Sequence, residues 1–347
     1  MERSGWSDSP GSGAGLQSTR PPLSQPPVRC PLCGSPKTIY FCAAFDRVRC
    51  IPQEPWDILQ CRDCRYGWTH PPLDETTIGD YYPPAYLGDT ARMIEEFQAG
   101  RLQKSRSWKK ETEKVRLVER YASGGRILDV GCADARFLLA LDPQKWARTG
   151  VEFAEPTVRM VSDAFPDLSL IPGNIYSDRL PPGLFDVICF WHVLEHLPAP
   201  LRVLARVREL LKPGGLVFIS LPNLDSLQAR IFRRFWYGFD DVPRHLHHFS
   251  PQSLQRILSL TDLEFLHGPL FFSRMVSFHA LKYSLINWSK DKFRSRGPYY
   301  ALKLFLFGFP IVERVAGSAG IITAVAGRPF REEERPGHRE PLAGAPA

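Results

Sequence analysis

The chain has 347 residues, of which 44% are hydrophobic and 23% are charged, and its formal net charge is +7 at pH 7. This is an ordinary globular composition, so it excludes a chain too polar to bury a core and allows one large α/β domain with an appended module, or two domains. The positive charge suggests an anionic surface or substrate, without choosing between nucleic acid, anionic lipid and a phosphorylated small molecule.

The two ends of the chain share a low-complexity composition. Residues 1–28 are rich in Ser, Gly and Pro and lack the apolar stretch of a signal peptide, so we expect a disordered leader. Residues 331–347 predict a disordered tail for the same reason. Without a secretion signal the protein is expected to be cytoplasmic. In that reducing compartment, its eight cysteines are more often metal ligands or core residues than disulfides.

Two cysteine pairs with two intervening residues come next, in the segments CPLCG and CRDCRYG. Such spacing lets both thiolates of a pair converge on one ion, and two pairs give a closed tetrahedral site that favours a structural zinc. The predicted ligands are Cys30, Cys33, Cys61 and Cys64. Two short strands are expected between the pairs, so residues 29–90 are predicted to form a zinc ribbon and a connector. The alternative is four unrelated buried thiols.

Residues 92–121 form a basic helical stretch, interpreted as a solvated helix in preference to a nucleic-acid patch. From residue 126 onward, short apolar strands alternate with amphipathic helices. This pattern predicts an α/β domain over residues 91–330 with a Rossmann-like, doubly wound, mostly parallel sheet of seven strands. One of its helices is expected over residues 200–215. Ligands of such sheets bind at the carboxyl ends of the strands.

Polar residues stand at those strand ends. Asp129 lies in the first strand of the domain, Gly131 turns the chain, and Glu152 ends the second strand, where a carboxylate can bind ribose hydroxyls. Ala133 and Ala135 occupy places where a dinucleotide-binding turn needs glycine for the pyrophosphate. They favour a cofactor without phosphate. A single added methyl group at each place is tolerable if φ is negative there.

Five segments follow one another in order: ILDVGCADARF, GVEFAEPTVRM, FDVICFWHVLEHLPAP, LLKPGGLVFISLPN and DVPRHLHHFSPQSLQRIL. Together they resemble a class I S-adenosylmethionine-dependent methyltransferase with an N-terminal four-cysteine zinc ribbon. The resemblance extends from Cys30 to about Phe330, and the family usually has glycine where Ala133 stands. It implies methyl transfer from S-adenosylmethionine, with zinc in a structural role.

The resemblance also implies a role for particular residues. Asp129 would hold the turn or the amino group of the cofactor, Glu152 would bind the ribose, and Phe153 would flank the adenine. The remaining predicted cofactor contacts are Gly131, Cys132 and Ala133 at the methionine part, Asn174 and Ile175 near the adenine amino group, and Trp191 and His192 over the methionine end.

Methyl transfer to a poor nucleophile needs a nearby base, and histidine is suited to that task. We predict His245 and His192 as the catalytic residues. His196 is as readily interpreted as a residue packed by Glu195. The alternative for the segment that contains His245 is a cap for the next helix, with Ser250 at the N-cap position.

About residues 270–315 a helical insert precedes the last strand. Aromatic and aliphatic residues beside a cluster of Lys and Arg, with no uninterrupted apolar span of membrane length, are typical of interfacial helices. Such helices would bring the protein to anionic lipid at the inner face of the membrane. A lid of ordinary packed helices is the alternative.

Three functions are compatible with these patterns. The leading hypothesis is a methyltransferase that acts on a small-molecule, saccharide or lipid-linked acceptor, such as an envelope precursor. An RNA methyltransferase is the second, but the segment FWHVLEH lacks the Asn/Asp-Pro-Pro-aromatic motif, so nucleic acid is not the expected partner. The third is a catalytically inactive zinc-ribbon binding protein, which binding of S-adenosylmethionine would exclude. The patterns leave the acceptor atom and the oligomeric state open.

Overall fold

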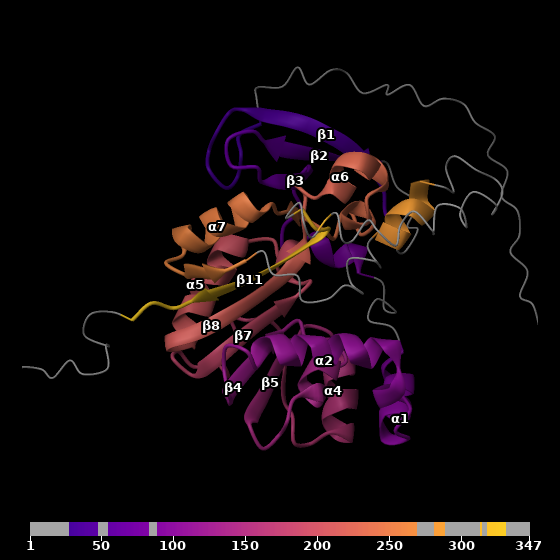
Figure 1. The fold of residues 1–347 in the computed structure, drawn as a ribbon, viewed down its shortest axis with the longest axis vertical. Helices are drawn as coiled ribbons and strands as arrows, with labels where there is room; N and C mark the ends of the chain where they lie inside the picture. Colours follow the sequence, from indigo (N-terminus) through magenta and orange to yellow (C-terminus); the bar gives the residue numbers. More distant parts are fainter. Residues whose placement is uncertain are drawn as a thin grey trace, which may run out of the picture.

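The computed structural model describes residues 28–47, 55–82, 89–268, 281–288, 313 and 318–330. Within them the chain forms two sheets, one of seven strands in the order β10-β11-β8-β7-β4-β5-β6 and one of four in the order β1-β2-β3-β9 (Figure 1). The helices and strands of the larger sheet belong to the predicted Rossmann-like domain, and the smaller sheet contains the predicted ribbon strands.

The bounds of the elements are as follows. The strands are β1 (Thr38–Ala44), β2 (Trp56–Cys61), β3 (Gly67–His70), β4 (Gly125–Val130), β5 (Trp146–Glu152), β6 (Ser169–Pro172), β7 (Phe185–Trp191), β8 (Leu211–Pro222), β9 (His247–His248), β10 (Glu264–His267) and β11 (Ile321–Gly327). The α-helices are α1 (Thr90–Gln98), α2 (Arg106–Val118), α3 (Arg136–Ala140), α4 (Glu155–Ala164), α5 (Pro200–Leu210), α6 (Leu227–Phe232) and α7 (Pro251–Leu260). Short 3-10 helices are η1 (Ile78–Tyr81), η2 (Leu102–Lys104), η3 (Leu194–His196), η4 (Arg233–Phe235) and η5 (Tyr237–Phe239).

The large sheet is mostly parallel, as predicted. Strands β6, β5, β4, β7 and β8 run parallel to one another, whereas β11 is antiparallel to both β8 and β10. The helix expected over residues 200–215 ends at Leu210, and β8 begins at the next residue. Pro213 disfavours a helical conformation at the residue before it, and Gly214 has φ +76°, so the helix prediction was too long by five residues.

Alternation along the strands divides the core into two layers. Ile127, Val187 and Phe218 belong to the cluster that contains the buried faces of α2, α3 and α4. Their neighbours Leu128 and Ile188 belong to the cluster that contains the buried faces of α5 and α7. Because successive side chains of a strand point to opposite faces, the helices cover both faces of the sheet. The carboxyl ends of its parallel strands therefore remain the natural place for a ligand.

The ribbon, which comprises β1, β2 and β3 with the two cysteine turns, is continuous with the main domain. Gly67 and Trp68 of β3 pair antiparallel with His248 and His247 of β9. Cys61, Tyr66 and Trp68 of the ribbon lie in the same buried cluster as α5 and α7. The side chain of Arg65 donates to Asp225, which follows β8 (Nε to Oδ2, 3.2 Å). The ribbon therefore shares a hydrophobic core with the main domain, although the sequence-based domain boundary near residue 90 separates the two.

Of the predicted insert, the structure describes residues 281–288 and Glu313, which are helical as expected. Leu281 and Leu285 are buried in a third cluster with Trp236 and Phe239. Asn287 donates from Nδ2 to Oδ1 of Asp240 at 2.6 Å. This part of the insert packs against the protein. The cationic group at residues 290–296 lies outside the described residues, so membrane contact stays a prediction. No helix in the described ranges combines the length and apolarity needed to cross a bilayer.

Candidate active site and cysteine cluster

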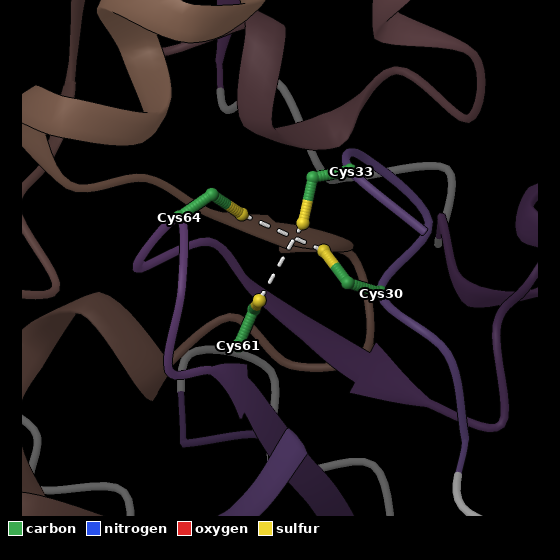
Figure 2. A group of neighbouring side chains, drawn as sticks. All are labelled: Cys30, Cys33, Cys61 and Cys64. Carbon is green, nitrogen blue, oxygen red and sulfur yellow. Dashed lines mark hydrogen bonds between the residues drawn. The ribbon is translucent and has the colours of Figure 1, made fainter. Parts of the chain in front are cut away.

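The four predicted metal ligands converge at one point of the ribbon (Figure 2). The Sγ atoms of Cys30 and Cys64 are 3.6 Å apart, and so are those of Cys33 and Cys61. A tetrahedral zinc with four sulfurs at about 2.3 Å holds those sulfurs about 3.8 Å apart. The cluster therefore has the size and donor set that a structural zinc requires. The contact with Cys64 lowers the pKa of the Cys30 thiol to about 5, which favours a thiolate.

The turn after β4 adopts an unusual backbone conformation. Gly131, Ala133 and Ala135 have φ angles of +68°, +48° and +60°. The condition of negative φ, under which alanine would be tolerated without strain, is therefore not met at either alanine. A left-handed conformation costs about 1–2 kcal/mol for a residue with a Cβ. The turn thus keeps the conformation that glycine would adopt more readily and carries strain at two positions, as active-site loops often do.

Glu152, at the end of β5, holds this turn in place. Its Oε2 accepts a hydrogen bond from the backbone N–H of Ala133 at 3.0 Å, and its Oε1 accepts one from Ala154 at 3.1 Å. The side chain is buried, and burial raises the pKa of the carboxyl above its usual value although both backbone donors lower it. Each carboxylate oxygen can accept a further bond, so the group can still bind ribose hydroxyls.

A second buried carboxylate lies in β4. Asp129 is 3% exposed, and burial raises the pKa of its carboxyl to about 8. The ammonium group of Lys114 on α2 opposes that shift and lies 5.4 Å from the centre of the Trp191 ring, at the end of β7. Helix α2 also buries Val115 and packs against α3, so the interpretation as a solvated helix applies only to its outer face.

The predicted adenine side is formed by less buried residues. Phe153, the residue after β5, is 58% exposed, and its ring meets the ring of Tyr82 edge-on with centroids 5.4 Å apart. Ile175 is buried, whereas Asn174 is exposed and its Oδ1 accepts a bond from the backbone N–H of Tyr176 at 3.0 Å. The Asn174 oxygen is thus already engaged in a local turn, which leaves one lone pair for a ligand.

Cys132 has a different position from the neighbouring turn residues. Its side chain is buried among the residues that pack on α3 and lies against Gly150, where an added Cβ would be 2.6 Å from its Sγ. Its backbone N–H donates to Val151 and its carbonyl accepts from Ala135. Cys132 therefore stabilises the turn from the core side, and its predicted contact with the methionine part remains a prediction.

Histidines and carboxylates gather beyond the end of β7. His192 has φ +61°, and its Nδ1 lies 3.4 Å from Oε1 of Glu195, a side chain that is 1% exposed. The rings of His196 and His245 meet with centroids 4.6 Å apart. Burial lowers the pKa of His196 to about 4. Burial raises the pKa of Glu195, but the surrounding imidazoles outweigh that effect and lower it. The site therefore favours a neutral imidazole at His196 beside a charged carboxylate.

The segment that contains His245 is held from both sides. Arg244 is fully buried and pairs with Asp46 and Asp241. From the ribbon, Thr69 donates from Oγ1 to the backbone carbonyl of His245 at 2.7 Å. Downstream, Ser250 caps α7 through a capping box, as the alternative interpretation expected. The cap does not conflict with the predicted role of His245, because the two involve different residues of the segment.

Three residues were absent from the sequence-based site. Tyr82, with its hydroxyl 3.3 Å from Nδ1 of His196, lies 114 residues away in the chain, and no motif surrounds it. Lys114 stands in a stretch of similar basic residues that gives no reason to single it out. Glu195 stands in the segment WHVLEH, where the sequence alone indicates only a packing partner for His196. Its near-complete burial is what gives it chemical significance.

Comparison with known proteins agrees with this geometry. Residues 101–267 match a family model described as a methyltransferase domain. The chain is 32% identical over 110 residues to a ubiquinone biosynthesis O-methyltransferase of Thiobacillus denitrificans. The aligned region covers 30% of this chain and 47% of that protein. The chain is 29% identical over 135 residues to the enzyme of that name from Pseudomonas aeruginosa, covering 37% and 57%. The chain thus spans about half the length of these curated relatives.

Among solved structures, a S-adenosylmethionine-dependent methyltransferase from Archaeoglobus fulgidus aligns with 69% of this chain and 100% of its own, at 19% identity and a TM-score of 0.42. The family match and the sheet agree: residues 101–267 match a methyltransferase domain, and they contain the parallel strands β4 to β8. In this chain the domain follows an N-terminal four-cysteine cluster.

Proposed function

We propose that the protein transfers a methyl group from S-adenosylmethionine to an oxygen of a small-molecule acceptor. The observation that carries the proposal is the position of Glu152 at the end of β5. Its carboxylate accepts a hydrogen bond from the backbone N–H of Ala133 in the turn, and the next residue is the exposed Phe153. A carboxylate for ribose hydroxyls beside an apolar ring for adenine suits the nucleoside part of this cofactor. When bound, the cofactor supplies a methyl group on a cationic sulfonium that a nucleophile attacks in line.

The residues around the methionine end can recognise a charged amino acid. Asp129 offers a buried carboxylate, and the buried Trp191 is the last residue of β7. A carboxylate in a buried site binds an ammonium group strongly because little water screens the pair. Asp129 would therefore hold the amino group of the cofactor, and the rigid strand ends would keep the methyl group oriented toward the histidines.

A proton must leave an acceptor hydroxyl during transfer, and the histidines can accept it. His192 has a side chain that is 32% exposed, and its Nδ1 faces Glu195. This leaves Nε2 as the proton acceptor, oriented by a buried carboxylate as in other base dyads. His245 lies further inside, beside His196. An oxygen acceptor is also consistent with the names of the curated relatives, which are O-methyltransferases.

Cofactor binding is tested by calorimetry with S-adenosylmethionine. Replacing Glu152 by alanine should weaken binding by about 1.5–3 kcal/mol, the value of hydrogen bonds to a charged group. The variant Glu152→Gln keeps an oxygen for the N–H of Ala133 and separates loss of ribose contacts from loss of the turn. Glu155→Ala is the matched control, since that carboxylate is exposed on α4 and pairs only with Arg159 among the described residues. Equal affinity in wild type and Glu152→Ala contradicts the assignment.

Catalysis is tested by transfer of labelled methyl groups to a panel of phenols, alcohols and amines. We expect products on oxygen, and transfer to amines alone would contradict the proposed acceptor class. The substitution His192→Asn suits the left-handed backbone at that position. It should lower kcat by about 10²–10³ while leaving cofactor affinity unchanged, as expected for a general base. An unchanged kcat excludes His192 from proton transfer.

A further inference from the structure

Glu195, His196 and His245 bring three potential metal ligands together beside the proposed acceptor site. One carboxylate oxygen and one ring nitrogen from each histidine all lie within 4.8 Å of one another. Glu195 and His196 come from η3, after β7, whereas His245 comes from the segment after η5. Two separate parts of the chain therefore converge on one point, which the ribbon strand β3 supports from outside through Thr69.

The Glu195 carboxylate needs a partner. Its side chain is 1% exposed, and among the described residues its Oε2 has no hydrogen-bond partner. Oε1 has only His192, with Nδ1 at 3.4 Å. Burying a carboxylate without a compensating cation costs several kcal/mol, and such an orphaned group often marks an ion. Since the neighbouring polar atoms are imidazole nitrogens, the Glu195 carboxylate could share a bound cation with two imidazoles.

The outer hydrogen bonds of both histidines suit ligation. Nδ1 of His245 lies 2.7 Å from the carbonyl oxygen of Gly238, which can only accept, so Nδ1 carries the proton and Nε2 carries the lone pair. Nδ1 of His196 faces the hydroxyl of Tyr82 at 3.3 Å. Metal-bound histidines typically bond a carbonyl or another polar group through the second ring nitrogen, which fixes the tautomer and the ring orientation.

We propose that Glu195, His196 and His245 bind one divalent transition-metal ion, with Zn²⁺ as the best match. Two imidazoles and one carboxylate are a set that zinc accepts, and three protein ligands leave a position open for an oxygen of the acceptor. Ligands about 2.1 Å from a tetrahedral ion lie about 3.4 Å apart, so binding requires the atoms to approach by at most about 1.4 Å, which small side-chain rotations supply.

The role of this ion in methyl transfer rests on the proposed function, whereas its binding does not. A bound cation would hold the acceptor oxygen and lower the pKa of its hydroxyl group. His245 would then be a ligand, and His192 would remain as the proton acceptor. The site would select acceptors that offer an oxygen to a metal, such as phenols or vicinal diols, and would disfavour amines that are protonated at neutral pH.

The test uses the full chain with zinc kept in the cysteine cluster. After mild chelation, the protein is titrated with Co²⁺, and binding is followed by absorption and calorimetry. We expect one equivalent that binds with the visible bands of nitrogen and oxygen ligands and without the sulfur charge-transfer band of a thiolate site. Total metal content should reach two equivalents per chain when Zn²⁺ is supplied.

Variants identify the ligands. Glu195→Gln, which keeps the shape of the side chain, and His196→Ala should each weaken Co²⁺ binding at least tenfold. His267→Ala on β10, an exposed histidine beside Tyr121, should leave it unchanged. If the wild-type protein binds no second equivalent of metal, the proposal is overturned, and the cluster holds a proton instead. Equal Co²⁺ binding by Glu195→Gln and wild type also overturns it. Cofactor calorimetry on the same samples separates that failure from a failure of the proposed function.

Discussion

The turn after β4 predicts opposite effects for two substitutions two residues apart. At Gly131 an added Cβ would stand 2.8 and 2.9 Å from the two methyl groups of Val193, and φ is +68°. At Ala133 the Cβ is already present at φ +48°. Gly131→Ala therefore adds strain and a clash, whereas Ala133→Gly removes strain.

The magnitudes follow from these terms. For Gly131→Ala, the left-handed backbone costs about 1–2 kcal/mol and overpacking about 1–3 kcal/mol. The lower entropy of the unfolded alanine chain returns about 0.4–1 kcal/mol, which leaves a destabilisation of roughly 2–4 kcal/mol. For Ala133→Gly, relief of about 1–2 kcal/mol exceeds the same entropy change, so the variant should be more stable by about 0.5–1 kcal/mol.

Urea denaturation of both variants and wild type measures these differences, and cofactor calorimetry reports whether the turn is still formed. We expect Gly131→Ala to lose cofactor affinity and Ala133→Gly to retain it. A Gly131→Ala protein within about 0.5 kcal/mol of wild type, or a Ala133→Gly protein destabilised by more than about 1 kcal/mol, would refute the described backbone.

Three further predictions address the shared sheet, the buried acid and the zinc. Gly67→Ala should destabilise the protein by about 1–3 kcal/mol in urea, because the new Cβ would lie 2.6 Å from a methyl group of Leu224, whereas Gly79→Ala, with open space around it, should change nothing. Cofactor affinity measured by calorimetry should rise as the pH approaches about 8, with proton uptake by the buffer, because the ammonium group requires the Asp129 carboxylate, whose pKa is raised to about 8. At higher pH the affinity should fall again, because the α-amino group of the cofactor loses its own proton. Asp129→Asn should bind weakly and lack the rise below about pH 8. Metal analysis should find about one thiolate-bound zinc per chain, and the double variant Cys30→Ser, Cys61→Ser should lose it. The double variant should still unfold in a single transition, at a lower urea concentration than wild type, because the ribbon shares its core with the main domain.

Much of the fold could be predicted from local patterns. The strands and crossover helices are visible in the period and length of the apolar runs, and Ser250 followed by a proline marks the start of α7. Polar residues at strand ends, such as Asp129 and Glu152, could be located because parallel strands bring their carboxyl ends to one edge. The cysteine pairs could be assigned because a spacing of two residues, present twice, is typical of thiolate metal ligands.

Other features depend on conformation or on distant contacts, which residue types alone do not reveal. The sequence contains Ala133 and Ala135 but not their φ angles, so the strain in the turn was missed. Strand β9 has only two residues and no hydrophobic alternation, and only its partner β3 defines it. The contact between Tyr82 and His196 depends on how the connector packs, for which no local signal exists.

The pairing of β3 with β9 also determines when the molecule can be completed during synthesis. Thr69 and its partner His248 are 179 residues apart, so a ribosome working at about 5–20 residues per second needs roughly 10–35 s to produce the missing strand. Throughout that interval β3 presents an open edge, of the kind that recruits other chains. Early capture of zinc by the cysteines would keep the nascent ribbon compact while it waits. Supply of metal during translation should therefore influence the yield of native protein more than supply after release.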